Sequence, residues 1–213
     1  MGIFRAATQC ALALVISGAA HAAPPTTAPA ERTLFLQRYA RIADFQLERG
    51  EVSVWEPMGY TAYNRPGVLV EFSGAIDKES GDVLSRLLER RTVGYLTLNS
   101  PGGLVEPTLR LGKLIRAKSV ATIVEGGRVC FSACALLFLA GTERVMGESI
   151  PMKSPPKRMR AEVGFHAPYI PQSDGTNRYL QDIKTSRVCG YIKSLMPPSQ
   201  VEELCATRWP PRG

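Results

Sequence analysis

The sequence predicts an α/β protein in which short apolar strands alternate with amphipathic helices around a mostly parallel sheet. The alternation is clearest between Val68 and Met146, where four strand-like runs are separated by segments of helical periodicity. The runs are nearly continuous in apolar residues, which is typical of strands buried on both faces. Strands and helices in this order form βαβ units, and such units build parallel sheets.

The first 22 residues have the composition of a secretory signal peptide. A positive start at Arg5 is followed by the small apolar run Ala6 to Gly18 and by the small-x-small tripeptide Ala20-His21-Ala22. The apolar run is shorter than the ~20 residues that span a bilayer, so cleavage is favoured over a membrane anchor. We therefore expect a periplasmic or secreted protein. No later stretch predicts a transmembrane segment.

Residues 23–66 are predicted to form a linker followed by a helix. Ala23 to Ala30 is rich in Pro, Ala and Thr, and poor in residues that form a core. Thr33 to Arg49 is predicted to be an amphipathic helix, and Glu51 to Met58 a short strand. The apolar positions behind the helix prediction are Leu34, Phe35, Leu36, Tyr39, Ile42, Phe45 and Leu47.

Residues 67–213 are predicted to form the main domain. Its expected strands cover Val68–Phe72, Gly94–Leu98, Val120–Val124 and Thr142–Met146, and its first helices Ser80–Arg90 and Leu104–Ala117. Glu148 to Glu162, rich in Pro, Lys and Arg, is predicted to be an inserted loop. Helices are predicted over Asn177–Leu195 and Ser199–Thr207.

Charge gives no support for a nucleic-acid partner. The chain carries a formal charge of +7, and removal of Arg5 with the signal peptide leaves 25 minus 19, or +6. The densest basic cluster, Lys153 to Arg160, has no aromatic side chains on which bases stack. We interpret the net positive charge as arginine side chains scattered over the surface.

Two motifs carry the chemistry. Ser100-Pro101-Gly102-Gly103 follows a predicted strand, and a strand that ends in Pro-Gly-Gly leaves backbone N–H groups free. Ser132 stands immediately before the apolar run Ala133 to Ala140, at a predicted helix N-terminus, which favours negative charge. Together they offer a nucleophile and donors for an oxyanion.

These motifs resemble the Clp protease family. Asn99 to Gly103 is similar to the Asn-Ser-Pro-Gly-Gly of its proteolytic subunit, and Cys130 to Gly141 to its nucleophile helix. Gly103 and Ser132 are 29 positions apart (132 minus 103), as in that family. Val163 to Pro168, which contains Gly-Phe-His, resembles its His motif. Bacterial periplasmic Clp-like proteins of the Clp/crotonase superfamily carry a similar Cys-x-Ser-Ala-Cys-Ala.

The resemblance implies a Clp/crotonase spiral of ββα units and assigns the site residues. Ser132 would be the nucleophile and His166, the one His after position 22, the general base. Gly103 and Ala133 would form the oxyanion hole through their N–H groups. The acid of the triad has no matching position. Four candidates remain by elimination: Asp174, Asp182, Glu202 and Glu203.

Four cysteines follow the signal peptide, an even number that permits disulfides in an exported protein. We predict a Cys189–Cys205 bond, because each lies in a predicted helix and Pro197-Pro198 makes a turn between them. Cys130 and Cys134, which flank Ser132, are either buried small side chains or a pair. No metal site is expected, because His is nearly absent.

The function predicted on this basis is an exported serine peptidase that hydrolyses peptides or unfolded protein through an acyl-enzyme, without a cofactor. The resemblance leaves a homo-oligomer open, and no ATPase partner is expected outside the cytoplasm. The main alternative is a weak or inactive binding protein that lacks the triad acid. An acyl-CoA enzyme of the crotonase type is less favoured. A Ser-Lys peptidase would use Lys113, Lys118 or Lys153.

Overall fold

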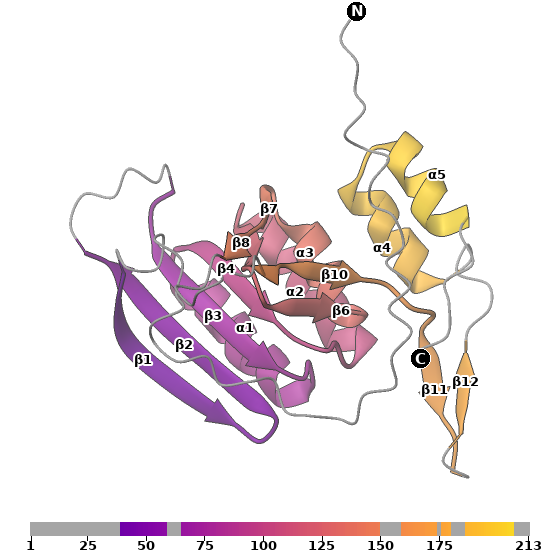
Figure 1. Ribbon diagram of the computed structural model, residues 1–213, viewed down its shortest axis with the longest axis horizontal. Coiled ribbons are helices and arrows are strands. Elements are labelled where there is room, and N and C mark those ends of the chain that lie inside the picture. The colour runs from indigo at the N-terminus through magenta and orange to yellow at the C-terminus, as the bar shows by residue number, and fades with distance from the viewer. Residues whose placement is uncertain (1–38, 59–64, 150–158, 174–175, 180–185, 207–213) are drawn as a thin grey trace, which may run out of the picture.

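The computed structural model describes residues 39–58, 65–149, 159–173, 176–179 and 186–206, and its centre is a six-stranded sheet (Figure 1). The strand order is β1-β2-β3-β4-β5-β7. The strands are β1 (Tyr39–Leu47), β2 (Gly50–Pro57), β3 (Val68–Gly74), β4 (Val93–Asn99), β5 (Ala121–Val124) and β7 (Arg144–Met146). β1, β2 and β3 are antiparallel, whereas β3, β4, β5 and β7 run parallel. The predicted α/β class with a mostly parallel sheet is therefore confirmed.

Three helices cover one face of this sheet: α1 (Lys78–Arg90), α2 (Val105–Ala117) and α3 (Ala133–Ala140). Their apolar sides pack with alternate strand residues such as Val70, Phe72 and Leu96 in one buried cluster. Burial of each large apolar side chain contributes roughly 1.5–3 kcal/mol. A second, smaller cluster contains Tyr39, Trp55, Leu69, Tyr95, Ala121 and Ile123.

α1 begins where the sequence provides a cap. The Asp77 carboxylate accepts from the Ser80 N–H, and the Ser80 hydroxyl accepts from the Asp77 N–H, both at 2.9 Å. This reciprocal pair satisfies two donors that the first turn of a helix leaves free. The cap fixes the start of the helix that follows β3.

Three two-stranded pairs and a helical hairpin complete the described chain. β6 (Val129–Phe131) pairs in parallel with β10 (Glu162–Gly164), and β11 (Tyr169–Pro171) pairs antiparallel with β12 (Asn177–Tyr179). β8 (Glu148–Ser149) pairs antiparallel with β9 (Met159–Arg160), both within the segment predicted as a loop. The hairpin consists of α4 (Arg187–Leu195) and α5 (Pro198–Ala206).

Two helix predictions are wrong. The described part of Thr33–Arg49 is the edge strand β1, and β1 and β2 belong to the same sheet as β3, so residues 39–57 are not separate from the main domain. Residues 177–179 form β12, and the helix within Asn177–Leu195 begins only at Arg187, where the Ser186 hydroxyl caps it. The predicted signal peptide and the predicted linker lie outside the described residues.

Candidate active site

Ser132 occupies a sharp turn between strand β6 and helix α3. Its backbone has φ +57° and ψ −121°, a region that non-glycine residues rarely enter. Among the described residues, Ser119 is the other non-glycine residue with positive φ. All eight residues of α3 are buried, so the core fixes the helix that starts beside this serine. A strained serine between a strand and a buried helix is the geometry in which an exposed nucleophile is presented.

The turn is tied to the strand that leads to His166. The Ser132 N–H donates to the Gly164 carbonyl at 2.8 Å, and Phe131 and Gly164 are partners in the β6–β10 pair. His166 follows Gly164 by two positions. The structure thus brings Ser132 and His166 to the carboxyl end of the same pair of strands.

The His166 ring is half-buried and oriented by its neighbours. Its Nδ1 lies 2.9 Å from the Ala167 carbonyl oxygen, and because a carbonyl only accepts, Nδ1 is the donor. The ring stacks on Tyr169 with centroids 5.9 Å apart. A protonated Nδ1 leaves Nε2 with the lone pair that a base requires.

The Pro-Gly-Gly turn lies against the start of α3. Ser100 is fully buried, and its hydroxyl accepts from the Gly102 N–H at 3.0 Å, so this serine organises the turn. A Cβ added to Gly102 would lie 2.8 Å from the Ser132 Cβ and 3.1 Å from the Ala133 nitrogen. Gly102 was not among the predicted site residues, although the motif that contains it was.

The two predicted oxyanion-hole residues are Gly103 and Ala133. Gly103 lies next to Ile76, and Ala133 is the first residue of α3. Gly103 has φ +153° and forms an isolated bridge with Ile76, in which Ile76 donates to Gly102 and accepts from Leu104. Ala133 is buried at the first position of the helix, where N–H groups have no partner within the helix. The glycine turn and the helix N-terminus therefore lie together beside Ser132.

The open question about Cys130 and Cys134 has an answer in the structure, because the two form a disulfide. Both side chains are fully buried, Cys130 in β6 and Cys134 in the first turn of α3. The predicted partners Cys189 and Cys205 are also bonded, and their bond joins α4 to α5. Disulfides of this kind are typical of oxidising compartments.

The acid candidates are not brought to His166 by any described contact. Asp174 and Asp182 lie outside the described residues, as does the side chain of Glu203. Glu202 is exposed on α5. The described residues contain no group of three or more His, Cys, Asp or Glu side chains placed to hold a metal. Nor does any helix among them have the length and apolar character needed to cross a membrane.

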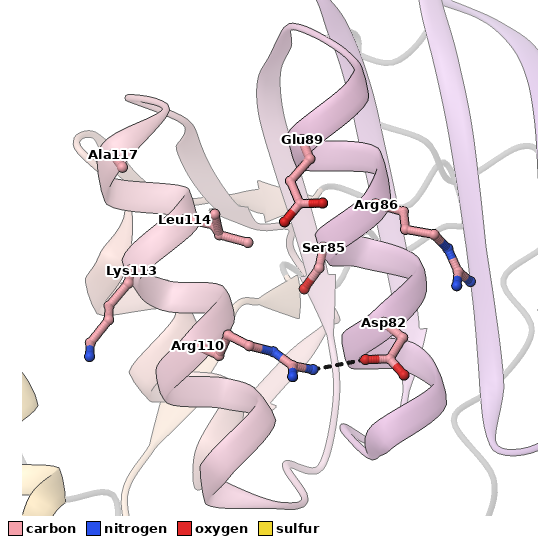
Figure 2. A pocket seen from close by; sticks show the side chains of 8 residues that line it. All are labelled: Asp82, Ser85, Arg86, Glu89, Arg110, Lys113, Leu114 and Ala117. Atoms are coloured by element: carbon pink, nitrogen blue, oxygen red, sulfur yellow. Dashed lines mark hydrogen bonds and ion pairs between the residues drawn. The ribbon is translucent and has the colours of Figure 1, made fainter.

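A separate hollow of about 580 Å³ lies on the helical layer between α1 and α2 (Figure 2). Figure 2 shows Arg110 reaching across it to Asp82, an ion pair of 2.9 Å. Lys113, one of the three lysines considered for a Ser-Lys site, also lines this hollow. Neither Ser132 nor His166 is among its lining residues, so it is not part of the candidate active site.

Comparison with known proteins finds no matching protein-family model and no matching curated protein. Among solved structures, the ClpP protease catalytic domain from Plasmodium falciparum is 15% identical, with a TM-score of 0.40 over 66% of this chain and 74% of that one. A mutant of 1510-N, a membrane-bound stomatin-specific protease, is 16% identical, with a TM-score of 0.42 over 62% and 66%.

A second mutant of the stomatin-specific protease, in complex with a substrate peptide, is 17% identical, with a TM-score of 0.40 over 59% of this chain and 56% of that one. TM-scores near 0.4 carry no argument about function, and the fold is established by the sheet and helices described above.

Proposed function

We propose that this chain is a serine peptidase of the Clp type, with Ser132 as nucleophile and His166 as general base. The observation that carries the proposal is the backbone of Ser132, strained at φ +57° between β6 and the buried helix α3. Strain of this kind costs about 1–3 kcal/mol and is concentrated at functional sites. The bond from Ser132 to Gly164, two residues before His166, supports the pairing.

In the proposed reaction, His166 Nε2 removes the hydroxyl proton as Ser132 Oγ attacks a peptide carbonyl carbon. The C–N bond breaks, the proton passes from His166 to the leaving amine, and the acyl group remains on Ser132. His166 then takes a proton from water as the water oxygen attacks the acyl carbon. The bond to Ser132 Oγ breaks, the proton passes from His166 to Oγ, and the acyl group leaves as a carboxylic acid. The contact from Nδ1 to the Ala167 oxygen supports this role, because it favours the tautomer that accepts at Nε2.

The negative charge of the tetrahedral intermediate would be held by the N–H groups of Gly103 and Ala133. The close approach of the glycine turn to the start of α3 supports this assignment. Helix N-termini favour anions, and loss of one such donor typically reduces turnover by about 10²–10³. No cofactor takes part in this chemistry.

The substrate would be an extended peptide or an unfolded segment of protein that binds beside the turn following β4. Leu104, the residue after the glycine pair, is 55% exposed and offers an apolar surface there. The two disulfides support a periplasmic or secreted location, in agreement with the signal peptide predicted over residues 1–22.

A fluorophosphonate probe tests the proposal directly. It should label purified protein at Ser132, and Ser132→Ala should abolish labelling, because the substitution removes only the nucleophilic oxygen. Ser194→Ala, at an exposed serine on α4, is the matched control and should label at the wild-type rate. Equal labelling of Ser132→Ala and wild type would rule out the proposed nucleophile.

The second candidate function is a binding protein that uses the same fold without turnover. The observation that motivates it is the sequence after His166, in which the triad acid of the resembled family has no matching position. A folded wild-type protein that binds peptide but resists the probe would support it.

A further inference from the structure

The disulfide between Cys130 and Cys134 spans the turn that presents Ser132. The bonded residues are four positions apart, and the serine lies midway between them. One sulfur belongs to the strand before the turn and the other to the helix after it. The bond therefore restrains the backbone on both sides of the strained residue.

Cys130 is held from both sides by neighbouring backbone. It pairs with Val163 of β10 and forms an isolated bridge with Ser100. Around that bridge, the Ser100 N–H donates to Val129 at 2.7 Å and the Phe131 N–H donates to Ser100 at 3.0 Å. The strand end of the disulfide thus lies within three hydrogen-bonded segments, one of which is the turn that leads to Gly102 and Gly103.

Cys134 is held by the core. It is the second residue of α3, whose eight residues are all buried, and this helix packs against α2 and β5. A helix enclosed in this way cannot rotate or slide without opening cavities. The disulfide joins this fixed helix to the fixed strand across Ser132.

We propose that Cys130 and Cys134 are positioning residues, whose bond holds Ser132 and the N–H groups at the start of α3 in the reactive arrangement. A strained backbone persists only where its surroundings over-determine it. Two backbone hydrogen bonds restrain the residue, from the Ser132 N–H to Gly164 and from the Ala135 N–H to the Ser132 carbonyl, and the disulfide is the third restraint. Without the bond, Ser132 relaxes towards an ordinary φ and moves away from the turn. The catalytic part of this inference rests on the proposed function of Ser132.

The test compares the two disulfides of one protein. Cys130→Ala/Cys134→Ala should lower the maximal rate of fluorophosphonate labelling by about 10- to 100-fold, the scale of a 1 Å misplacement, with the half-saturating probe concentration unchanged. Cys189→Ala/Cys205→Ala removes a bond with a separation of 16 and should lower Tm more, since longer loops stabilise more. It should nevertheless label at the wild-type rate below its Tm.

Amide hydrogen exchange supplies a readout that needs no activity. In Cys130→Ala/Cys134→Ala, the amide of Ser132 should exchange at least 10-fold faster than in wild type, while the amide of Leu96 in β4 keeps its rate. Faster exchange in the variant, together with a wild type that resists the probe, would rule out the peptidase proposal and retain the restraint. Unchanged exchange at Ser132 in the variant, or unchanged labelling of the variant where the wild type does label, would overturn the positioning role.

A second route avoids dependence on one variant. If the alanine pair does not fold, Cys130→Val/Cys134→Ala fills the space of the buried sulfurs with apolar atoms. Reduction of Cys189→Ala/Cys205→Ala by a phosphine in mild denaturant, followed by return to buffer, breaks the same bond without substitution at the turn. Both should reproduce the faster exchange at Ser132, and wild-type protection in both would overturn the proposal.

Discussion

Gly102 is the residue whose missing side chain matters most to the candidate site. Its φ is +102°, and an added Cβ would lie 2.6 Å from the Phe131 carbonyl oxygen as well as 2.8 Å from the Ser132 Cβ. These neighbours are backbone atoms or part of the strained turn, so they cannot move aside cheaply. Glycine at this position lets the turn and the nucleophile approach each other.

Gly102→Ala should therefore reduce probe labelling by about 10²-fold or more and destabilise the fold by about 1–3 kcal/mol. The matched control is Gly190→Ala, at a helical position with nothing within 4 Å of the added Cβ. It should keep wild-type labelling and gain about 0.5–1 kcal/mol of stability. Urea denaturation measures both changes, and full labelling of Gly102→Ala would contradict the close approach.

The proton chemistry of His166 gives the second prediction at this scale. If the ring acts as base, labelling should be lost at low pH, because a protonated imidazole has no lone pair to accept the serine proton. His166→Ala should lose nearly as much labelling as Ser132→Ala, because residues that act as a unit are not additive. A flat pH profile with intact labelling in His166→Ala would exclude this base.

The acid can be sought one residue at a time. Asp174, Asp182, Glu202 and Glu203 are replaced singly by the corresponding amide, and hydrolysis of a peptide substrate is measured. A drop of about 10⁴ at one position would identify the triad acid. Equal small effects at all four would indicate a dyad that relies on the Ala167 carbonyl, and we expect weak turnover in that case.

At the scale of elements, the C-terminal hairpin is attached to the core by Tyr191. This side chain of α4 reaches the backbone of α3, where its hydroxyl donates to the Leu136 carbonyl at 3.2 Å. Gly112 of α2 leaves room for it, since a Cβ there would overlap the tyrosine hydroxyl. Arg116 donates to the Leu139 and Leu195 carbonyls and joins the same helices.

Gly112→Ala should displace Tyr191 and cost about 1–3 kcal/mol through overpacking. Tyr191→Phe, which keeps the ring, should cost only about 1 kcal/mol for the lost hydrogen bond and the unpaired carbonyl. Urea denaturation monitored by tryptophan fluorescence measures both. Equal stability of Gly112→Ala and wild type would show that Tyr191 can move aside for the added methyl group without cost.

The same tyrosine gives stability a dependence on pH. Burial raises the pKa of Tyr191 above its ordinary value, so the folded state retains a proton that the unfolded state releases. The corresponding stability is present below about pH 10 and is lost as the pH rises above it. The free energy of unfolding of wild type minus that of Tyr191→Phe should fall above pH 10, and a constant difference would contradict this.

Two strands were predicted as parts of helices, each for a different reason. Tyr39, Ile42 and Phe45 recur every three residues, as on a helix, but β1 is an edge strand that buries only Tyr39 and Leu47. Ile42 and Phe45 are 42% and 38% exposed, so their spacing does not mark a face that is buried in the core. Strand β12 has three residues, too few for a periodicity to show.

The motifs of the candidate site are easier to recognise in the sequence than the edges of the fold. Ser132, His166 and the glycine turn follow from motifs whose residue types the chemistry requires. The disulfide that spans Ser132 could not be predicted, because a sequence does not distinguish two buried free cysteines from two bonded ones. The hydrogen bond to the Gly164 carbonyl could not be predicted either, because every residue type supplies a backbone carbonyl.

At the scale of the whole molecule, the order of strands explains why the central prediction succeeded. β3, β4 and β5 are buried on both faces, so their apolar runs are continuous and easily recognised. Their parallel pairing places the ends of β3 and β4 at one edge, where Asn99 donates to the Ser73 hydroxyl at 3.1 Å. The turn of the candidate site starts from that edge.

Export is the prediction that concerns the whole chain. N-terminal sequencing of protein recovered from the periplasm or medium should find a start near Ala23. Replacement of the residue at the expected cleavage site, Ala22→Arg, should leave the unprocessed form, since this site favours small residues. Recovery of intact protein beginning at Met1 from the cytosol alone would contradict the assignment.

The two disulfides also bear on how the chain matures. After position 22 the four cysteines pair in the order of the sequence, Cys130 with Cys134 and Cys189 with Cys205. When the chain is exported with its N-terminus first, the next cysteine to emerge after Cys130 or after Cys189 is therefore its native partner. Oxidation in order of emergence yields the native set, and no bond has to be exchanged later. Such a chain should mature with a thiol oxidase alone, without an isomerase.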